Sequence, residues 1–374
     1  MPKTPTIDDL RRYAVARTLF KPTTLARAID RLGFVQADPI RAPARAQDLI
    51  LRHRVAGYRA GDLERRYARL PIDEDAFVNY GFLPRRHLAL MHPRVARRPW
   101  PAKTKKRATA ILDFIREQGP THPRLVAEHF AHGRRINAWG GSSTATTHLL
   151  DDMHYRGLLR IRRRLNGTRI YEAAEHALPL DDSASARQAR AAALVDLIVR
   201  KYAPLPASSL VRLVYLLRYG APHLQAETQA ALAASRHSLA GARIDGATWY
   251  WPADENPRSK RYVVDGQARL LAPFDPVVWD RRRFELFWGW TYRFEAYTPA
   301  PKRKLGYYAL PLLWHENVVG WANASTRDGR LTIDTRFVGA APRDAAFRRA
   351  LGDERDRLEE FLGLRDSESV PLQA

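Results

Sequence analysis

Three segments of the chain repeat one succession of elements, in which amphipathic helices are followed by a pair of short strands. In the clearest copy, apolar residues recur at helical spacing over 107–118, and this predicted helix ends at Gly119-Pro120. Two further helices are predicted over 121–130 and 142–157. The order helix, helix, helix and hairpin is typical of a winged helix, whose third helix enters a DNA groove while its hairpin, the wing, contacts the backbone.

The wing of this copy is predicted over 158–173, with Asn166-Gly167 as its turn, because this dipeptide favours the positive φ angles of a tight hairpin. Basic side chains crowd this hairpin, which favours contact with phosphates. The predicted DNA-contacting residues here are Arg160, Arg162, Arg163, Arg164 and Arg169. The alternative is that the winged helix is only a scaffold and that these arginines are solvated.

Two other segments follow the same plan, one over 191–254 and a less regular one that begins the chain with helices over 7–20 and 23–33. From 261 to 337 the pattern changes to alternating short strands, among them 262–266 and 292–299, which suggests a small barrel. The predicted fold class is α+β: three tandem winged-helix units followed by a small C-terminal β-barrel. The predicted domains are 1–100, 101–180, 185–255, 256–363 for the barrel with its closing helix, and 364–374 as a disordered tail.

The formal net charge of +22 and the pI near 10.6 change this picture from a general fold to a binding function. Because 62 basic residues face only 40 acidic ones, the chain repels itself unless a polyanion neutralises it. Nucleic acid is the usual partner of such a chain, and an anionic membrane surface is the weaker alternative. We therefore expect double-stranded DNA as the partner, bound by a monomer.

Several classes of protein are excluded or disfavoured by what the sequence lacks. No run of about 18 apolar residues occurs, and the first residues do not resemble a signal peptide, so we expect a cytoplasmic protein that associates with the nucleoid through DNA. The chain has no cysteine, and its 12 histidines form no recognisable ligand motif, so we expect neither a metal nor a cofactor. The residues Asp275, Asp280 and Glu285 suggest a metal nuclease, and the preferred alternative is that Asp280-Arg281-Arg282 forms ion pairs on the barrel.

Candidate chemistry lies in the first unit, where Phe34, Gln36 and Asp38 alternate and would share one face of an extended segment. An amide can orient a water molecule, and a carboxylate can deprotonate it or stabilise a nearby cation. The alternative is structural, because Asp38-Pro39 is also a plausible helix cap followed by proline at the first helical position.

The run Phe34-Val35-Gln36-Ala37-Asp38, with Arg45 and Arg54-Val55-Ala56-Gly57-Tyr58 beyond it, resembles the YcaQ-like (AlkZ/YcaQ group) winged-helix DNA glycosylases. The C-terminal run over 270–314 resembles the end of the same family and is the more specific part of the likeness, which extends from about Ile7 to Phe337. The resemblance implies three winged-helix units and a barrel around a DNA channel. It also implies a monofunctional glycosylase that releases N-alkylated purines and unhooks interstrand crosslinks.

Within that resemblance, this chain has the Gln-x-Asp form of the family's catalytic pair. Gln36 would therefore position water and Asp38 would be the catalytic carboxylate. Family members usually carry a Glu-Tyr-Trp-x-His-like stretch, but the corresponding residues here are 77–85, without the Glu and the His, although Tyr80 and Phe82 could still stack on a base. The remaining predicted DNA contacts are Arg45, Arg54, Tyr58, Tyr80, Arg85, Lys302, Arg303 and Lys304.

The reaction expected from these residues is hydrolysis of an N-glycosidic bond. A β-elimination step would need an amine nucleophile. Of the nine lysines, only Lys21 lies near the Gln36–Asp38 segment in the sequence, so no lyase activity is expected. The competing interpretations are a non-catalytic winged-helix transcription regulator and an RNA-binding protein.

Overall fold

The computed structural model describes residues 4–95, 98–130, 134–136, 142–174 and 181–364, with the side chains of 134–136 and 142–144 outside the description. The predicted disordered tail therefore lies outside the described residues, apart from Leu364. The chain divides into two compact units. The first contains Met1–Leu63, Asp196–Leu213 and Ala233–Ala374, and the second contains Glu64–Val195 and Val214–Leu232. The boundary at 63/64 falls inside the predicted first domain, 1–100, and the predicted domain boundaries stay predictions.

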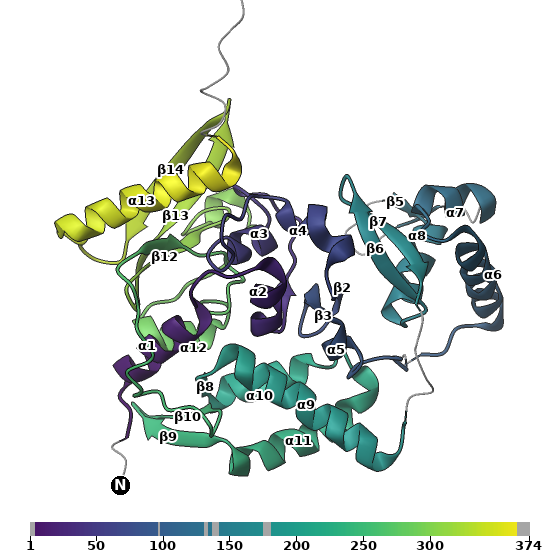
Figure 1. Cartoon of the computed structure of the whole chain (residues 1–374), viewed down its shortest axis with the longest axis horizontal. Coiled ribbons are helices and arrows are strands. Elements are labelled where there is room, and N and C mark those ends of the chain that lie inside the picture. Colours follow the sequence, from purple (N-terminus) through teal and green to yellow (C-terminus); the bar gives the residue numbers. More distant parts are fainter. Residues whose placement is uncertain (1–3, 96–97, 131–133, 137–141, 175–180, 365–374) are drawn as a thin grey trace, which may run out of the picture. The chain divides into compact units, whose positions relative to one another are not determined.

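The second unit contains the helix and hairpin order that the sequence predicts most clearly. Its helices are α5 (Arg85–Leu88), α6 (Ala102–Gln118), α7 (Pro123–Phe130) and α8 (Ala145–Tyr155), with the 3₁₀ turn η1 at Tyr67–Arg69. Its strands are β2 (Ile72–Ala76), β3 (Tyr80–Pro84), β4 (Arg134–Ile136), β5 (Ser142–Thr144), β6 (Leu159–Leu165) and β7 (Thr168–Ala173). Figure 1 shows α6, α7 and α8 beside the β6–β7 hairpin, which all three contact.

The β6–β7 hairpin turns at Asn166 and Gly167, whose φ angles are 49° and 83°. Two consecutive positive φ angles are what the right-handed twist of a two-residue hairpin requires. The predicted hairpin is therefore confirmed at its turn.

The first unit begins with α1 (Ile7–Thr18), α2 (Leu25–Leu32), β1 (Val35–Gln36) and α3 (Ala46–Leu51), and α4 (Asp62–Arg66) crosses into the second unit. The helices α9 (Ala184–Tyr202), α10 (Ala207–Leu216) and α11 (Gln225–Ser238) are also divided between the units, with η2 at Pro222–Leu224 in the second. The strands β8 (Leu205–Pro206), β9 (Ala240–Ile244) and β10 (Ala247–Trp251) form a sheet in the order β8-β10-β9.

The C-terminal part contains β11 (Ala268–Leu270), α12 (Arg281–Trp288), η3 (Ala300–Lys302), β12 (Leu310–Trp314), β13 (Asn317–Arg327), β14 (Arg330–Phe337) and α13 (Ala345–Leu362). The strands make an open antiparallel sheet in the order β11-β12-β13-β14, and α13 packs against β11. Figure 1 shows α13 beside the strands of this sheet. The expected closed barrel is thus a four-stranded sheet in the described residues. The expected strands at 262–266 and 292–299 do not form there either.

An apolar core in this unit joins α1 to the C-terminal sheet. It contains Val15 from α1, Phe284 from α12, Leu313 from β12 and Val318 from β13, all buried. Trp288, Trp290 and Trp321 are partly buried and pack against this core. None of the described helices is long and apolar enough to cross a membrane.

Candidate functional site

The candidate catalytic segment follows directly from the end of α2. Gly33 ends that helix in the left-handed region, with φ of 69°, and Phe34 and Val35 are then buried in an extended conformation. This anchors Gln36, whose side chain is 5% exposed. In the described part of the chain, the buried Oε1 of Gln36 accepts no hydrogen bond. Because an unmet buried acceptor costs about 1–3 kcal/mol, this oxygen is suited to a donor that arrives with a substrate or water.

Asp38 is 9% exposed and does not cap a helix. Its Oδ1 accepts a hydrogen bond of 2.9 Å from the N–H of Ile40, two residues on, which is an Asx-turn. Its own N–H donates to Oε1 of Gln47 at 3.3 Å. The next helix, α3, begins only at Ala46. The structural alternative of a helix cap is therefore excluded, although a local turn remains part of the role of Asp38.

The electrostatic surroundings of Asp38 favour a basic carboxylate. Burial raises its pKa, and the hydrogen bond from Ile40 opposes this rise. Among the described residues, no arginine or lysine forms an ion pair with Asp38, and its Oδ2 accepts no hydrogen bond. A carboxylate with a raised pKa and one unengaged oxygen is a stronger base than an exposed aspartate.

Two tyrosines of the C-terminal part lie within the electrostatic field of Asp38. Burial raises the pKa of Tyr308 well above its ordinary value, and the negative charge of Asp38 is the next cause. The same two causes raise the pKa of Tyr297. The ring of Phe294 lies 5.4 Å from that of Tyr308 and 6.0 Å from that of Tyr297. We call residues 294–308 the aromatic loop.

The aromatic loop is held by hydrogen bonds to its own backbone. The buried carboxylate of Glu295 accepts from the N–H groups of Lys304, at 2.8 Å, and Leu305, at 2.7 Å. The carbonyl of Leu305 in turn accepts from Nδ2 of Asn323 at 2.8 Å. Gly306 has φ of 116°, and a Cβ there would lie 2.3 Å from the Asn323 side chain. Only glycine fits, so the loop has a fixed shape.

The outer side of this fixed loop presents aromatic and cationic groups. Tyr297 is 66% exposed, and Lys302 and Lys304 are also exposed. The guanidinium of Arg303 lies over the exposed ring of Tyr307, 5.0 Å from its centroid, and its Nε donates to a loop carbonyl at 2.8 Å. Stacking rings together with cations are what single-stranded or unstacked nucleotides bind. The predicted basic turn, Lys302-Arg303-Lys304, thus lies on the same loop as Tyr297 and Tyr308, whose pKa values the charge of Asp38 raises.

A family-level sequence comparison matches residues 29–361 to the DNA glycosylases described as AlkZ-like. The chain belongs to the AlkZ-like DNA glycosylase family. It is therefore a DNA repair glycosylase, and DNA is its substrate. Among solved structures, it is similar to the Streptomyces sahachiroi DNA glycosylase AlkZ, with a TM-score of 0.62 and 12% identity over 96% of this chain and 98% of that one. At that identity, the likeness establishes the shared fold only.

Two of the predicted DNA contacts of this AlkZ-like chain are wrong because the side chains are inside the protein. Arg54 is 0% exposed, and its guanidinium binds both carboxylate oxygens of Asp275, at 2.7 and 2.9 Å. It also donates to the carbonyl of Ile50 at 2.7 Å. Tyr58 is buried and donates to Asp48 at 2.6 Å. Both residues stabilise the fold. Asp280, for which the sequence suggested an ion pair, instead caps α12 by accepting the N–H of Arg283 at 3.0 Å.

The stacking role expected for Tyr80 and Phe82 also needs correction. Phe82 is buried and packs edge-on against Tyr67, 5.9 Å between ring centroids. The hydroxyl of Tyr80 is buried, which raises its pKa, and its ring lies under Arg169 at 4.6 Å. Neither ring is free to receive a base in this conformation. Arg85 is about half exposed and pairs with Asp73 at 3.3 Å, while Arg45 is partly buried at the start of α3.

Carboxylates of the second unit engage most of the wing arginines. The pairs are Arg160 with Asp73 and Glu172, Arg162 with Glu172, Arg164 with Glu74, and Arg169 with Asp151 and Glu74. Glu74 is buried, so Arg164 and Arg169 compensate a charge inside the protein. Arg163 is exposed and forms no ion pair in the described residues. DNA contact by the wing therefore stays a prediction that now depends mainly on Arg163.

Lys201, which no sequence motif indicates, lies against the catalytic segment. Its ammonium donates to the carbonyls of Leu32, at 3.2 Å, and Phe34. Burial lowers its pKa to about 7. Lys201 is 169 and 167 residues from Leu32 and Phe34 in the sequence, so spacing could not reveal this contact. The described residues hold no group of three or more potential metal ligands.

Proposed function

We propose that this DNA glycosylase hydrolyses the N-glycosidic bond of N-alkylated purines, including those in interstrand crosslinks, with Gln36 and Asp38 as its catalytic pair. The observation that carries the proposal is the pairing of two buried side chains with one residue between them in the sequence. The carboxylate of Asp38 has no cationic partner, and the amide oxygen of Gln36 has no donor, among the described residues. The pair has the Gln-x-Asp form.

The chemistry follows from the leaving group. An N7-alkylated purine is already cationic, so the bond between C1′ and N9 can break with its electron pair moving to the purine, without a strong general acid. The sugar then becomes oxocarbenium-like and must be stabilised and attacked by water. The charge of Asp38 stabilises this cation. Gln36 orients the water, and Asp38 takes its proton as the new C1′–O bond forms.

The fold and the aromatic loop support this reaction with binding surfaces. We interpret the three helix-and-hairpin segments as winged-helix units that hold duplex DNA, acting as a monomer associated with the nucleoid. The fixed aromatic loop would position the damaged nucleotide beside Asp38, with Tyr308 near the base and its cations on the phosphates. The amine of Lys201 is buried and bound to two carbonyls, which supports a monofunctional hydrolase.

The test is release of free base from duplex DNA that carries N7-methylguanine, measured by chromatography, with an undamaged duplex of the same sequence as control. The proposal predicts release of methylated purine only, and an intact sugar–phosphate backbone until alkali cleaves the abasic site. A duplex joined by an N7–N7 crosslink should be separated in the same way. Absence of release from every alkylated duplex, by a protein that binds DNA, would contradict the alkylpurine specificity.

A further inference from the structure

A polar cavity lies in the unit that contains Asp38, between α1, the end of α3, the segment 261–269 and α13. Its volume is about 750 Å³. Seven cationic residues line it: Lys21, Arg31, Arg52, Arg59, Arg261, Arg269 and Arg357. Only two acidic residues, Asp265 and Glu360, line it with them. The lining is therefore much more basic than an ordinary protein surface.

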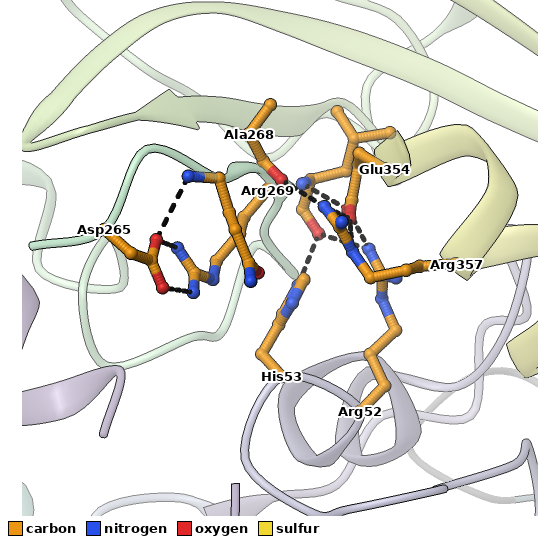
Figure 2. A network of polar contacts seen from close by, with 9 residues as sticks. Arg52, His53, Asp265, Ala268, Arg269, Glu354 and Arg357 are labelled. Carbon is orange, nitrogen blue, oxygen red and sulfur yellow. Dashed lines mark hydrogen bonds and ion pairs between the residues drawn. The ribbon is translucent and has the colours of Figure 1, made fainter. Parts of the chain in front are cut away.

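Arg52, Asp265, Arg269 and Arg357 of the cavity lining belong to an ion-pair network that extends from buried to half-exposed side chains (Figure 2). Glu354 binds both Arg52 and Arg357, the latter at 3.1 Å, while Asp265 binds Arg269 at 2.6 Å. Three guanidinium groups thus share two carboxylates. The Nε of Arg52 is buried and has no hydrogen-bond partner in the described residues. Even the paired part of the lining keeps an excess positive charge.

Burial and neighbouring positive charge lower the pKa values of Arg52 and His53 beside this network. Burial lowers the pKa of Arg52, and Arg357 and Arg269 lower it further, although Glu354 opposes them. Burial also lowers the pKa of His53 well below its ordinary value, with Arg52 and Arg269 adding to the shift. The arginine contributions to the lowered pKa of His53 show that positive charge reaches this side of the cavity in addition to the effect of burial.

The outer rim carries exposed cations. Lys21, Arg31 and Arg261 are exposed, and none of them forms an ion pair in the described part of the chain. Arg31 lies over the ring of Phe20 at 4.1 Å, and Arg261 donates to the hydroxyl of Tyr262 at 2.6 Å. Both contacts hold the guanidinium groups in place, and Glu255 interacts with their charge without forming an ion pair with either of them in the described residues.

The cavity continues into a second hollow of about 580 Å³, because Ala16, Arg31 and Arg261 line both. The second hollow adds Arg17 and Arg200, which pair with Glu255 and Asp254. We call the two hollows together the basic groove. Val263 of its lining is 76% exposed, so an apolar contact is available among the cations.

The basic groove is separate from the catalytic segment. Gln47, near the first residue of α3, accepts the N–H of Asp38, whereas Arg52 and His53 follow the last residue of the same helix. At 1.5 Å per residue, five residues of helix separate Gln47 from Arg52 by about 7.5 Å. Neither Gln36 nor Asp38 lines the groove.

We propose that the basic groove binds a phosphodiester strand of nucleic acid outside the excision site. The unpaired rim cations meet successive phosphates, and Val263 contacts a sugar or base. A strand fits better than a small phosphate ester, because the hollows are continuous and their unpaired cations lie on an exposed rim. Pockets for small ligands usually enclose most of the ligand. The proposal concerns the binding of undamaged strands, so it can be tested independently of the excision chemistry.

The test compares the variant K21A/R31A/R261A with a matched control, R343A/R348A/R349A, which removes three exposed arginines at α13 outside the groove. Affinity for a fluorescein-labelled undamaged 20-mer of thymidine is measured by anisotropy across salt concentrations. Each phosphate contact contributes about 0.7 to the slope of log K against log salt for single strands. The groove variant should therefore lower the slope by about 2 and the affinity at 0.1 M salt by roughly 10–100-fold. Equal slopes in wild type and groove variant would overturn the proposal, as would an equal loss in the control.

A second experiment tests where the strand binds. Because the chain has no cysteine, one cysteine can be introduced and labelled specifically. An environment-sensitive fluorophore on V263C should respond to the 20-mer, while the same label on V338C, exposed but outside the groove, should not. Millimolar ADP serves as the small-ligand arm. A V263C response to ADP but not to the 20-mer would show that the occupant is a free phosphate ester and would refute the strand. The single-turnover rate of base release at saturating enzyme should be unchanged in K21A/R31A/R261A.

Discussion

Replacing Asp275 with Asn leaves the guanidinium of Arg54 inside the protein without its carboxylate. Both side chains are fully buried, and two short hydrogen bonds join them. Asp275 also accepts the N–H of Val277 at 3.0 Å, and Asn can keep that bond through its oxygen. The substitution therefore removes mainly the charge and one of the two contacts with Arg54.

The magnitude follows from burial. Removing one partner of a buried ion pair typically costs about 3–5 kcal/mol, because the remaining charge is desolvated and uncompensated. For domains of about 150–250 residues, each kcal/mol shifts the melting temperature by about 2–4 °C. We expect D275N to melt roughly 6–20 °C below wild type. The double variant R54M/D275A removes both charges and should recover much of this loss.

The assay is thermal unfolding by circular dichroism, with DNA affinity measured well below the transition. If Arg54 contacted DNA instead, D275N would keep wild-type stability and R54M/D275A would lose affinity. Wild-type melting of D275N would refute the reasoning. Weak DNA binding by a well-folded R54M/D275A would return Arg54 to the DNA interface.

Three further predictions concern Lys201, the wing and the aromatic loop. The pKa of Lys201 is about 7 in the folded protein against 10.5 in the unfolded chain, so the unfolded chain binds more protons between these values and stability rises with pH there. Relative to K201M, the wild type should gain about 2 kcal/mol of unfolding free energy from pH 7.5 to 9, measured by denaturant titration, and parallel curves would contradict this. R163A should lower the slope of log K against log salt for duplex binding by about 0.9 and leave the melting temperature unchanged. R164A should lower the melting temperature, because the buried carboxylate of Glu74 loses its partner. The opposite assignment of the two effects would contradict the ion pairs. G306A, strained at φ of 116°, should slow base release at least 10-fold at saturating enzyme with the overall fold intact by circular dichroism, and an unchanged rate would exclude a role for the loop.

Local patterns could be predicted from the sequence, and long-range pairing could not. The Asn166-Gly167 turn and the amphipathic helices depend on neighbours a few residues apart, and the structure has them where the pattern predicts. Arg54 lies in the run that resembles the family and is predicted to contact DNA, but its actual partner, Asp275, is 221 residues away and no local pattern indicates it. Glu74, the buried partner of Arg164, is 90 residues from that arginine in the sequence.

The C-terminal region also shows that a local pattern can predict the wrong element. Residues 292–299 alternate like a strand, yet Glu295 uses its carboxylate to hold the backbone of Lys304 and Leu305, and a fixed loop forms instead. The buried residues of this stretch, Tyr292 and Glu295, are three positions apart, so their burial does not follow the two-residue period of a strand face. Proximity of Tyr308 to Asp38 likewise depends on the tertiary fold, which no local pattern contains.

The most direct test of the account is single-turnover base release by Asp38→Asn on a duplex that contains N7-methylguanine. Asn keeps an oxygen for the N–H of Ile40, so the Asx-turn should persist, but the negative charge and the basicity are lost. We predict a loss of at least ~10²-fold in the rate at saturating enzyme, with DNA affinity and melting temperature near wild type. Near-normal release by a stable Asp38→Asn would contradict the catalytic role of Asp38.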